Sequence, residues 1–122
     1  MIIGVTATGN NLNDSMDPKF GRSQYFVIVD SETMEFDSFE NPGVSASGGA
    51  GIQAAQAIAD RNVDVLITGN VGPKAFSVLS KANIKVVTGA SGTVKQAIDD
   101  FKSGLLDETD NPTVKAHNGI NR

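Results

Sequence analysis

The stretch VDVLITGNVGP, residues 63–73, decides the fold because a strand, a glycine-rich turn and a helix start follow one another directly. Residues 63–67 are mostly apolar and β-branched, which is typical of a strand buried on both faces of a sheet. Gly69 and Gly72 permit a sharp reversal of the chain, and Pro73 is tolerated at the first position of a helix. The stretch therefore predicts one strand–helix unit of an α/β domain.

The same order of apolar run, glycine-rich turn and helical pattern occurs three times in the chain. The other two turns are SGGAG at residues 47–51 and TGASGT at residues 88–93. The helix after the last turn has the clearest boundaries, since Thr93 and Gln96 predict a capping box and Gly104 predicts the end of the helix. Right-handed crossovers place such turns at the carboxyl ends of parallel strands.

The N-terminal half predicts the remaining strands. Residues 1–7 and 25–29 are apolar runs, and residues 34–39 alternate as in a half-exposed strand at a sheet edge, so that the last two form a hairpin. Residues 10–23 and 41–51 are polar or glycine-rich and predict loops. Together these patterns predict a single α/β domain over residues 1–106 with a five-stranded, mixed, mainly parallel sheet. Residues 107–122 are too polar to offset the entropy of ordering and predict a disordered tail.

Composition excludes several classes of function. The 122-residue chain has no cysteine and a formal net charge of −4. It therefore has no disulfide and no thiolate for zinc or an iron–sulfur cluster. The basic residues are scattered, which gives no electrostatic footprint for duplex nucleic acid. Residues 1–6 lack the basic lead of a signal peptide and no run of residues is apolar enough to span a bilayer, so we expect a cytoplasmic protein with no membrane partner.

The three glycine-rich turns predict a binding site for an anion if they gather at one rim of the sheet. A helix N-terminus offers unpaired backbone N–H groups and about half a positive charge. Taken singly, each turn is explained more simply as a structural reversal, and the functional hypothesis depends on their convergence. The expected donors come from the turns, and the expected cations lie beside them: Gly48, Gly49, Gly51, Asn70, Gly72, Ser91, Gly92 and Thr93 as donors, with Lys19, Arg22 and Lys74 as cations.

Catalytic interpretations find little support in the sequence. Residues 49–54 match the G-x-G-x-x-A string of dinucleotide-binding proteins, but a long loop precedes them and no carboxylate follows the next strand. Asp14, Asp17 and Asp30 do not have the placement of a two-metal nuclease site. His117 is the only imidazole and lies in the predicted tail, so no hydroxyl has a partner base. We therefore predict no catalytic residue and no metal ligand, and expect the protein not to be an enzyme.

Four motifs in order give the chain a family resemblance. They are DPKFGR before the strand YFVIVD, then SGGAG, then TGNVGPKAF, then GASGTV, at residues 17–30, 47–51, 68–76 and 89–94. With these motifs the chain resembles the dinitrogenase iron-molybdenum cofactor biosynthesis family, the small domain shared by NifX-like carriers and the C-terminal part of NifB-like proteins. The resemblance implies a ribonuclease H-like, three-layer α/β/α fold without nuclease activity. It also implies a role in binding or carrying an anionic iron–sulfur precursor of the cofactor, with cofactor-assembly proteins as partners.

The chain departs from this family pattern at one position. Cofactor-carrying relatives often have a histidine just before the Phe-Gly pair, where this chain has Lys19. A charged lysine pairs with an anion but has no lone pair for a metal. The first hypothesis is therefore a non-enzymatic anion-binding protein, with an iron–sulfur or iron-molybdenum precursor as one candidate cargo. The alternatives are a nucleotide- or phosphate-binding module, and an interaction domain that pairs through its edge strand at residues 34–40.

Overall fold

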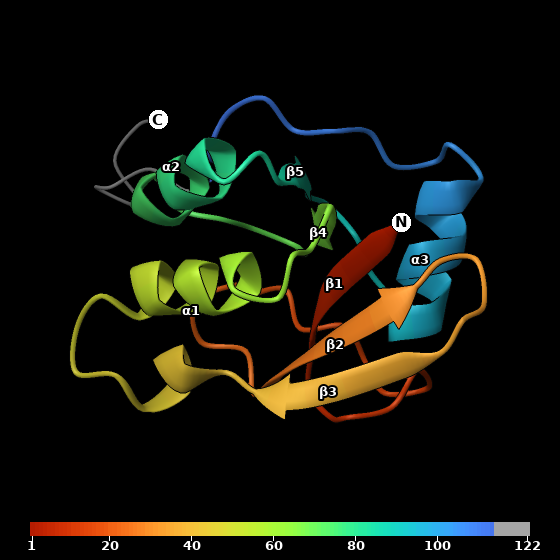
Figure 1. Cartoon of the computed structure of the whole chain (residues 1–122), viewed down its shortest axis with the longest axis horizontal. Coiled ribbons are helices and arrows are strands. Elements are labelled where there is room, and N and C mark those ends of the chain that lie inside the picture. Colours follow the sequence, from red (N-terminus) through yellow and green to blue (C-terminus); the bar gives the residue numbers. More distant parts are fainter. Residues whose placement is uncertain (114–122) are drawn as a thin grey trace.

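The computed structural model describes residues 1–113 and shows an α/β domain (Figure 1). Its strands and α-helices follow the order that the sequence predicts, and one short 3₁₀ helix lies in the predicted loop at residues 41–51. They are β1 (Ile2–Ala7), β2 (Tyr25–Asp30), β3 (Phe36–Glu40), η1 (Pro42–Ser45), α1 (Ala50–Ala59), β4 (Val65–Ile67), α2 (Pro73–Lys81), β5 (Lys85–Val87) and α3 (Val94–Lys102).

The five strands form one mixed sheet in the order β3-β2-β1-β4-β5. β1 pairs in parallel with β4, and β4 pairs in parallel with β5. β2 runs antiparallel to both of its neighbours, so four strands point the same way and β3 lies at the edge. The predicted fold class is therefore confirmed, including the hairpin in the N-terminal half.

Helices cover both faces of the sheet, which gives the three layers that the family resemblance implies. Figure 1 shows α1 and α2 together on one side and α3 on the other. Alternate strand residues face opposite layers, as the two-residue period of a strand requires. Val5 and Ile67 pack in the core under α3, while Leu66 and Val86 pack in the core under α1 and α2.

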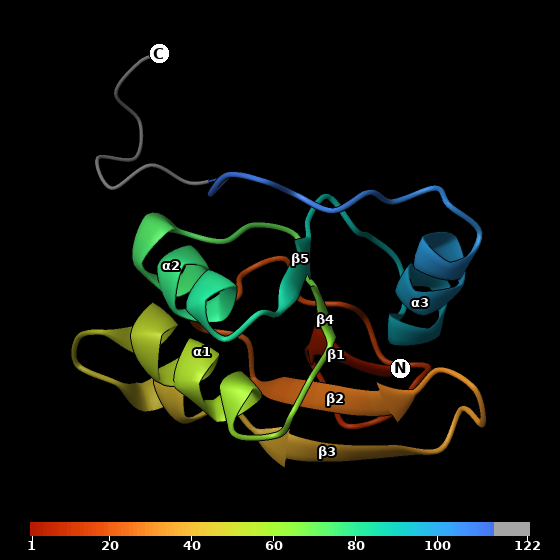
Figure 2. The ribbon, with the colours of Figure 1, turned by 45° about the horizontal axis from the view of Figure 1, so that its top comes forward.

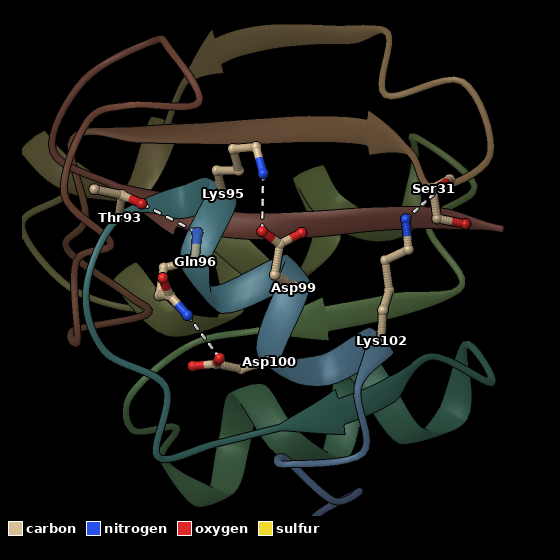
Figure 3. A network of polar contacts seen from close by, with 7 residues as sticks. All are labelled: Ser31, Thr93, Lys95, Gln96, Asp99, Asp100 and Lys102. Carbon is tan, nitrogen blue, oxygen red and sulfur yellow. Dashed lines mark hydrogen bonds and ion pairs between the residues drawn. The ribbon is translucent and has the colours of Figure 1, made fainter.

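Helix α3 has the boundaries that its sequence signals predict. The Thr93 hydroxyl accepts a hydrogen bond from the Gln96 N–H at 3.0 Å, and Gly104 adopts a φ of 81° after the last turn. The Gln96 side chain, however, donates to Asp100 at 2.7 Å, so the reciprocal half of the capping box is replaced by a contact one turn onward. Figure 3 shows this exposed face, where Lys95 also pairs with Asp99 at 2.8 Å.

The predicted loop at residues 10–23 is more ordered than its composition indicates, and one strand begins late. In residues 10–23, the Met16 N–H donates to the Gly92 carbonyl at 2.8 Å and the Asp17 N–H donates to the Thr6 carbonyl at 2.9 Å. Met34 adopts a φ of 61° in the turn, so β3 begins at Phe36 and not at Met34.

The predicted disordered tail is wrong in its boundary. Residues 107–113 lie along β5, where the Thr109 N–H donates to the Val86 carbonyl at 2.6 Å and Glu108 bridges to Val87. An unpaired strand edge orders a polar segment through backbone hydrogen bonds, without the burial of apolar side chains. Residues 114–122, with His117, lie outside the described part of the chain. Among residues 1–113, no helix is long and apolar enough to cross a membrane.

Candidate functional site

A cleft of about 650 Å³ lies where α1 and α2 begin. Three segments that are distant in the sequence line it: the loop before β2, the first turn of α1 and the first turn of α2. Their lining residues are Lys19, Phe20, Gly21, Arg22, Gly49, Ala50, Gly51, Ile52, Asn70, Gly72, Pro73, Lys74 and Ala75. The structure thus brings two of the three glycine-rich turns together with the motif that precedes β2.

Glycines allow these segments to meet backbone to backbone. A Cβ atom on Gly69 would lie 2.6 Å from the Pro18 Cα, and a Cβ atom on Gly21 would lie 3.2 Å from the Gly51 N. The Asn70 N–H donates to the Pro18 carbonyl at 2.8 Å, which joins the second turn to the loop. The Asp17 carboxylate accepts from the Lys19 N–H at 2.9 Å and fixes the turn that presents Lys19.

Two other glycines have open space where their side chains would project. A Cβ atom on Gly49 or on Gly72 would meet no heavy atom within 4 Å. Both residues are helix N-caps, Gly49 of α1 and Gly72 of α2, and neither has a side chain that could cap its helix. The cleft therefore opens directly onto two uncapped helix ends.

Five backbone donors are unpaired at these two ends. The N–H groups of Ala50, Gly51, Ile52, Lys74 and Ala75 have no hydrogen-bond acceptor within residues 1–113. Pro73 contributes no donor, because its nitrogen carries no hydrogen. Unpaired N–H groups and the positive poles of two helices at one cleft favour the binding of a negative group.

The third turn does not belong to this cleft, so the predicted convergence of all three turns is wrong. Helix α3 packs on the opposite face of the sheet (Figure 1), and its first donors are already paired. The Val94 N–H donates to the Asp14 carbonyl and the Lys95 N–H donates to the Leu12 carbonyl, both at 2.9 Å. Of the expected site residues, Ser91, Gly92 and Thr93 lie on this other face, and Gly48 precedes the lining of the cleft without being part of it.

All three expected cations lie at the cleft, but one is partly committed elsewhere. Arg22 Nη1 donates to the carbonyls at the end of η1, including that of Ala46 at 3.0 Å. The ammonium groups of Lys19 and Lys74 are exposed and have no carboxylate within 4.0 Å among residues 1–113. Both lysines are therefore available to balance the charge of an anion, in a chain whose net charge is −4.

An apolar wall completes the cleft, and the sequence contains only an indirect signal of it. Phe20 is buried, with its ring 5.6 Å from that of Phe26, and Ile52 and Ala75 lie beside the helix ends. These residues, with Gly21, Ala50 and Pro73, were missed as site residues. Only their positions in the sequence could have indicated them, because each lies close to an expected donor or cation.

The chemistry of the lining is that of binding by charge and hydrogen bonds. It combines backbone N–H groups, two ammonium groups, a guanidinium and the Asn70 amide, with apolar carbon beside them. The lining residues include no carboxylate, imidazole, hydroxyl or thiol. Within residues 1–113 no group of three His, Cys, Asp or Glu residues is placed to hold a metal ion.

Comparison with known protein families gives one match over most of the chain. The model of the family described as dinitrogenase iron-molybdenum cofactor matches residues 1–104. This range contains every element from β1 to α3 and every residue that lines the cleft.

Individual relatives agree with this match. The orange protein of Desulfovibrio gigas, solved in its apo form, is 44% identical over 92% of this chain and 95% of that chain, with a TM-score of 0.88. An NMR structure from Thermotoga, provisionally described as a NifB protein, is 34% identical over 88% of this chain and 91% of that chain, with a TM-score of 0.77. An uncharacterised protein of Methanocaldococcus jannaschii is 32% identical over 79% of this chain and 84% of its own length.

Proposed function

This chain belongs to the dinitrogenase iron-molybdenum cofactor family, and on that premise we propose that it is a non-enzymatic binding protein for an anionic ligand. The ligand class is a metal–sulfur precursor of the iron-molybdenum cofactor, which the protein holds and passes to cofactor-assembly proteins. The site is the cleft at the N-termini of α1 and α2.

One observation carries the proposal: two uncapped helix N-termini and two unpaired lysines surround one cleft. The five residues whose N–H groups have no acceptor within residues 1–113 all line this cleft, while the first N–H groups of α3 are paired with carbonyls of the loop before β2. A helix end that is left without a cap has a free-energy cost unless water or a ligand satisfies its donors. Helices α1 and α2 both lack a side-chain cap at this cleft, which supports a bound anion as the partner of their N–H donors.

The donor set also supports a metal–sulfur anion as the class of ligand. Backbone N–H groups donate hydrogen bonds to sulfide, and the lysines offset its charge. Ile52 and Pro73 add apolar surface, which suits polarisable sulfur better than a strongly hydrated oxyanion. The chain has no cysteine to ligate iron, so the cargo must bring its own metal ligands.

Anaerobic gel filtration with a coloured anion tests the proposal. We expect protein mixed with tetrathiomolybdate, the simplest molybdenum–sulfur anion, to elute with visible absorption and with molybdenum. Replacing both Lys19 and Lys74 by Met should reduce the amount bound, because the charge balance of the site is lost. Colourless wild-type protein that elutes free of molybdenum would contradict the proposal.

A nucleotide or phosphate ligand remains the second candidate, because helix N-termini and lysines also bind phosphate. A thermal-shift panel separates the two classes. A ligand at about 100 times its dissociation constant adds about 2.7 kcal/mol of stability. Stabilisation by phosphate or ATP, without stabilisation by tetrathiomolybdate, would favour the second candidate.

A further inference from the structure

Residues 107–113 form a strap that runs from α3 across β5 to the start of α2, as Figures 1 and 2 both show. At β5 the strap is held by Thr109, whose hydroxyl lies 2.6 Å from the Thr88 hydroxyl and also accepts from the Thr88 N–H at 3.3 Å. These contacts cover an edge of the sheet that would otherwise have unpaired backbone groups.

The other end of the strap is held at the second glycine-rich turn. The Thr113 hydroxyl accepts from the Val71 N–H at 2.8 Å, and the Thr113 N–H donates to the Val71 carbonyl at 2.9 Å. Val71 is buried, and the next residue is Gly72, the N-cap of α2 in the lining of the cleft. The strap thus ends against the backbone that presents the α2 donors.

Three segments hold the second turn, and the strap is one of them. The Asn70 N–H donates to the Pro18 carbonyl at 2.8 Å, and the Gly69 carbonyl accepts from the Gly89 N–H at 3.0 Å. Thr113 supplies the bonds to Val71, immediately before the cleft. The bonds to Gly69 and Asn70 come from loops of the domain, whereas the bonds to Val71 come from a segment that follows the last helix.

We propose that the strap positions the α2 side of the cleft, with Thr113 as a positioning residue, and that strap docking and anion binding strengthen each other. This inference rests on the proposed function of the cleft. Donors that are fixed before binding lose less entropy when an anion binds. Because coupling between two sites is reciprocal, an anion bound at α2 must also favour the docked strap.

The test uses the full chain with Thr113→Val, which keeps the shape of the side chain and removes its hydroxyl. Thr113→Ser restores the hydroxyl, and Asn111→Ala is a control at a strap residue that makes no hydrogen bond within residues 1–113. Tetrathiomolybdate affinity is measured for all four proteins. Amide hydrogen exchange at Val71, Lys74 and Thr109 is measured without and with the anion.

We expect Thr113→Val to weaken tetrathiomolybdate binding by about fivefold, the effect of one lost hydrogen bond, and to speed exchange at Val71 before any ligand is added. Thr113→Ser and Asn111→Ala should bind like the wild type. In the wild type, the anion should slow exchange at Thr109, which lies away from the cleft.

The outcomes separate the two proposals. Wild-type protein that does not bind tetrathiomolybdate contradicts the proposed function, and the effect of Thr113→Val on exchange at Val71 then still tests the positioning role. Wild-type protein that binds the anion without slower exchange at Thr109 contradicts the coupling alone. Equal binding by wild type and Thr113→Val would overturn the strap proposal and leave the proposed function standing. Unchanged exchange at Val71 in Thr113→Val would also overturn it.

Discussion

Replacing Gly72 by Asp should raise the stability of the protein and weaken anion binding. Gly72 is the N-cap of α2 with φ −81° and ψ 170°, a conformation that any residue adopts, and its Cβ position is open. An Asp at this N-cap accepts from the free N–H groups of the first turn. The better cap and the helix dipole together add about 0.5–1 kcal/mol of stability.

The same carboxylate should repel an anion in the cleft. Two unit negative charges about 6 Å apart repel by about 3 kcal/mol at an effective dielectric constant of about 20. If only half of this repulsion acts on the bound anion, the affinity falls by about tenfold. The Asp side chain also occupies N–H donors that the anion would use. Thermal unfolding and equilibrium dialysis against tetrathiomolybdate measure the two effects on the same protein samples.

Thr93→Asp is the matched control for this substitution. It places the same charge at the N-cap of α3, on the other face of the sheet, where Thr93 already caps the helix. We expect its anion affinity to stay within about twofold of the wild type, because exposed charges beyond a Debye length are screened. Wild-type affinity in Gly72→Asp, or an equal loss in Thr93→Asp, would refute the reasoning.

Two further predictions test the charges and the glycines of the site. Lys74→Met should weaken tetrathiomolybdate binding by about three- to tenfold and make the affinity less dependent on salt concentration. Lys95→Met on α3 should change neither property. Titrations at two salt concentrations measure both variants, and equal losses of affinity would contradict a local role for Lys74. Gly69→Ala should lower the free energy of unfolding by about 2 kcal/mol or more in urea, because the new Cβ would lie 2.6 Å from the Pro18 Cα. A Cβ atom on Gly48 would meet no heavy atom within 4 Å, so Gly48→Ala should change the free energy of unfolding by less than about 1 kcal/mol. Similar losses of stability in the two variants would count against the close packing of Gly69 on Pro18.

Much of the fold could be predicted from the sequence because its local signals agree with one another. Pro73 begins α2, Thr93 caps α3 and Gly104 follows its last turn, as the capping rules predict. Alternation at residues 34–39 indicated an edge strand, and β3 is at the edge although it begins at Phe36. Each of these signals depends on a few neighbouring residues, so it can be read without knowledge of tertiary packing.

The position of α3 could not be predicted in the same way. α1 and α2 each connect two parallel strands, so the right-handed crossover rule assigns their face of the sheet. α3 follows β5, and no later strand returns it to the sheet within residues 1–113, so the rule does not apply to it. The third glycine-rich turn was therefore predicted on the wrong face of the sheet. Ser91, Gly92 and Thr93 were assigned to the cleft for the same reason.

The strap was missed for a different reason. A polar composition at residues 107–113 predicts too little apolar burial for order, but Thr109 and Thr113 are held by hydrogen bonds to an open strand edge and to Val71. That edge is a property of the assembled sheet and leaves no trace in the local sequence. The apolar wall at Phe20 was missed similarly, because its place beside Ile52 depends on the contact between distant segments.

An NMR titration of backbone amides with tetrathiomolybdate under anaerobic conditions shows whether an anion binds at the N-termini of α1 and α2. We expect saturable shifts at Gly51, Ile52, Lys74 and Ala75, with a single dissociation constant, and no shift at Val94. Unperturbed α1 and α2 amides at saturating anion, or shifts of equal size at Val94, would show that the anion does not bind specifically at this cleft.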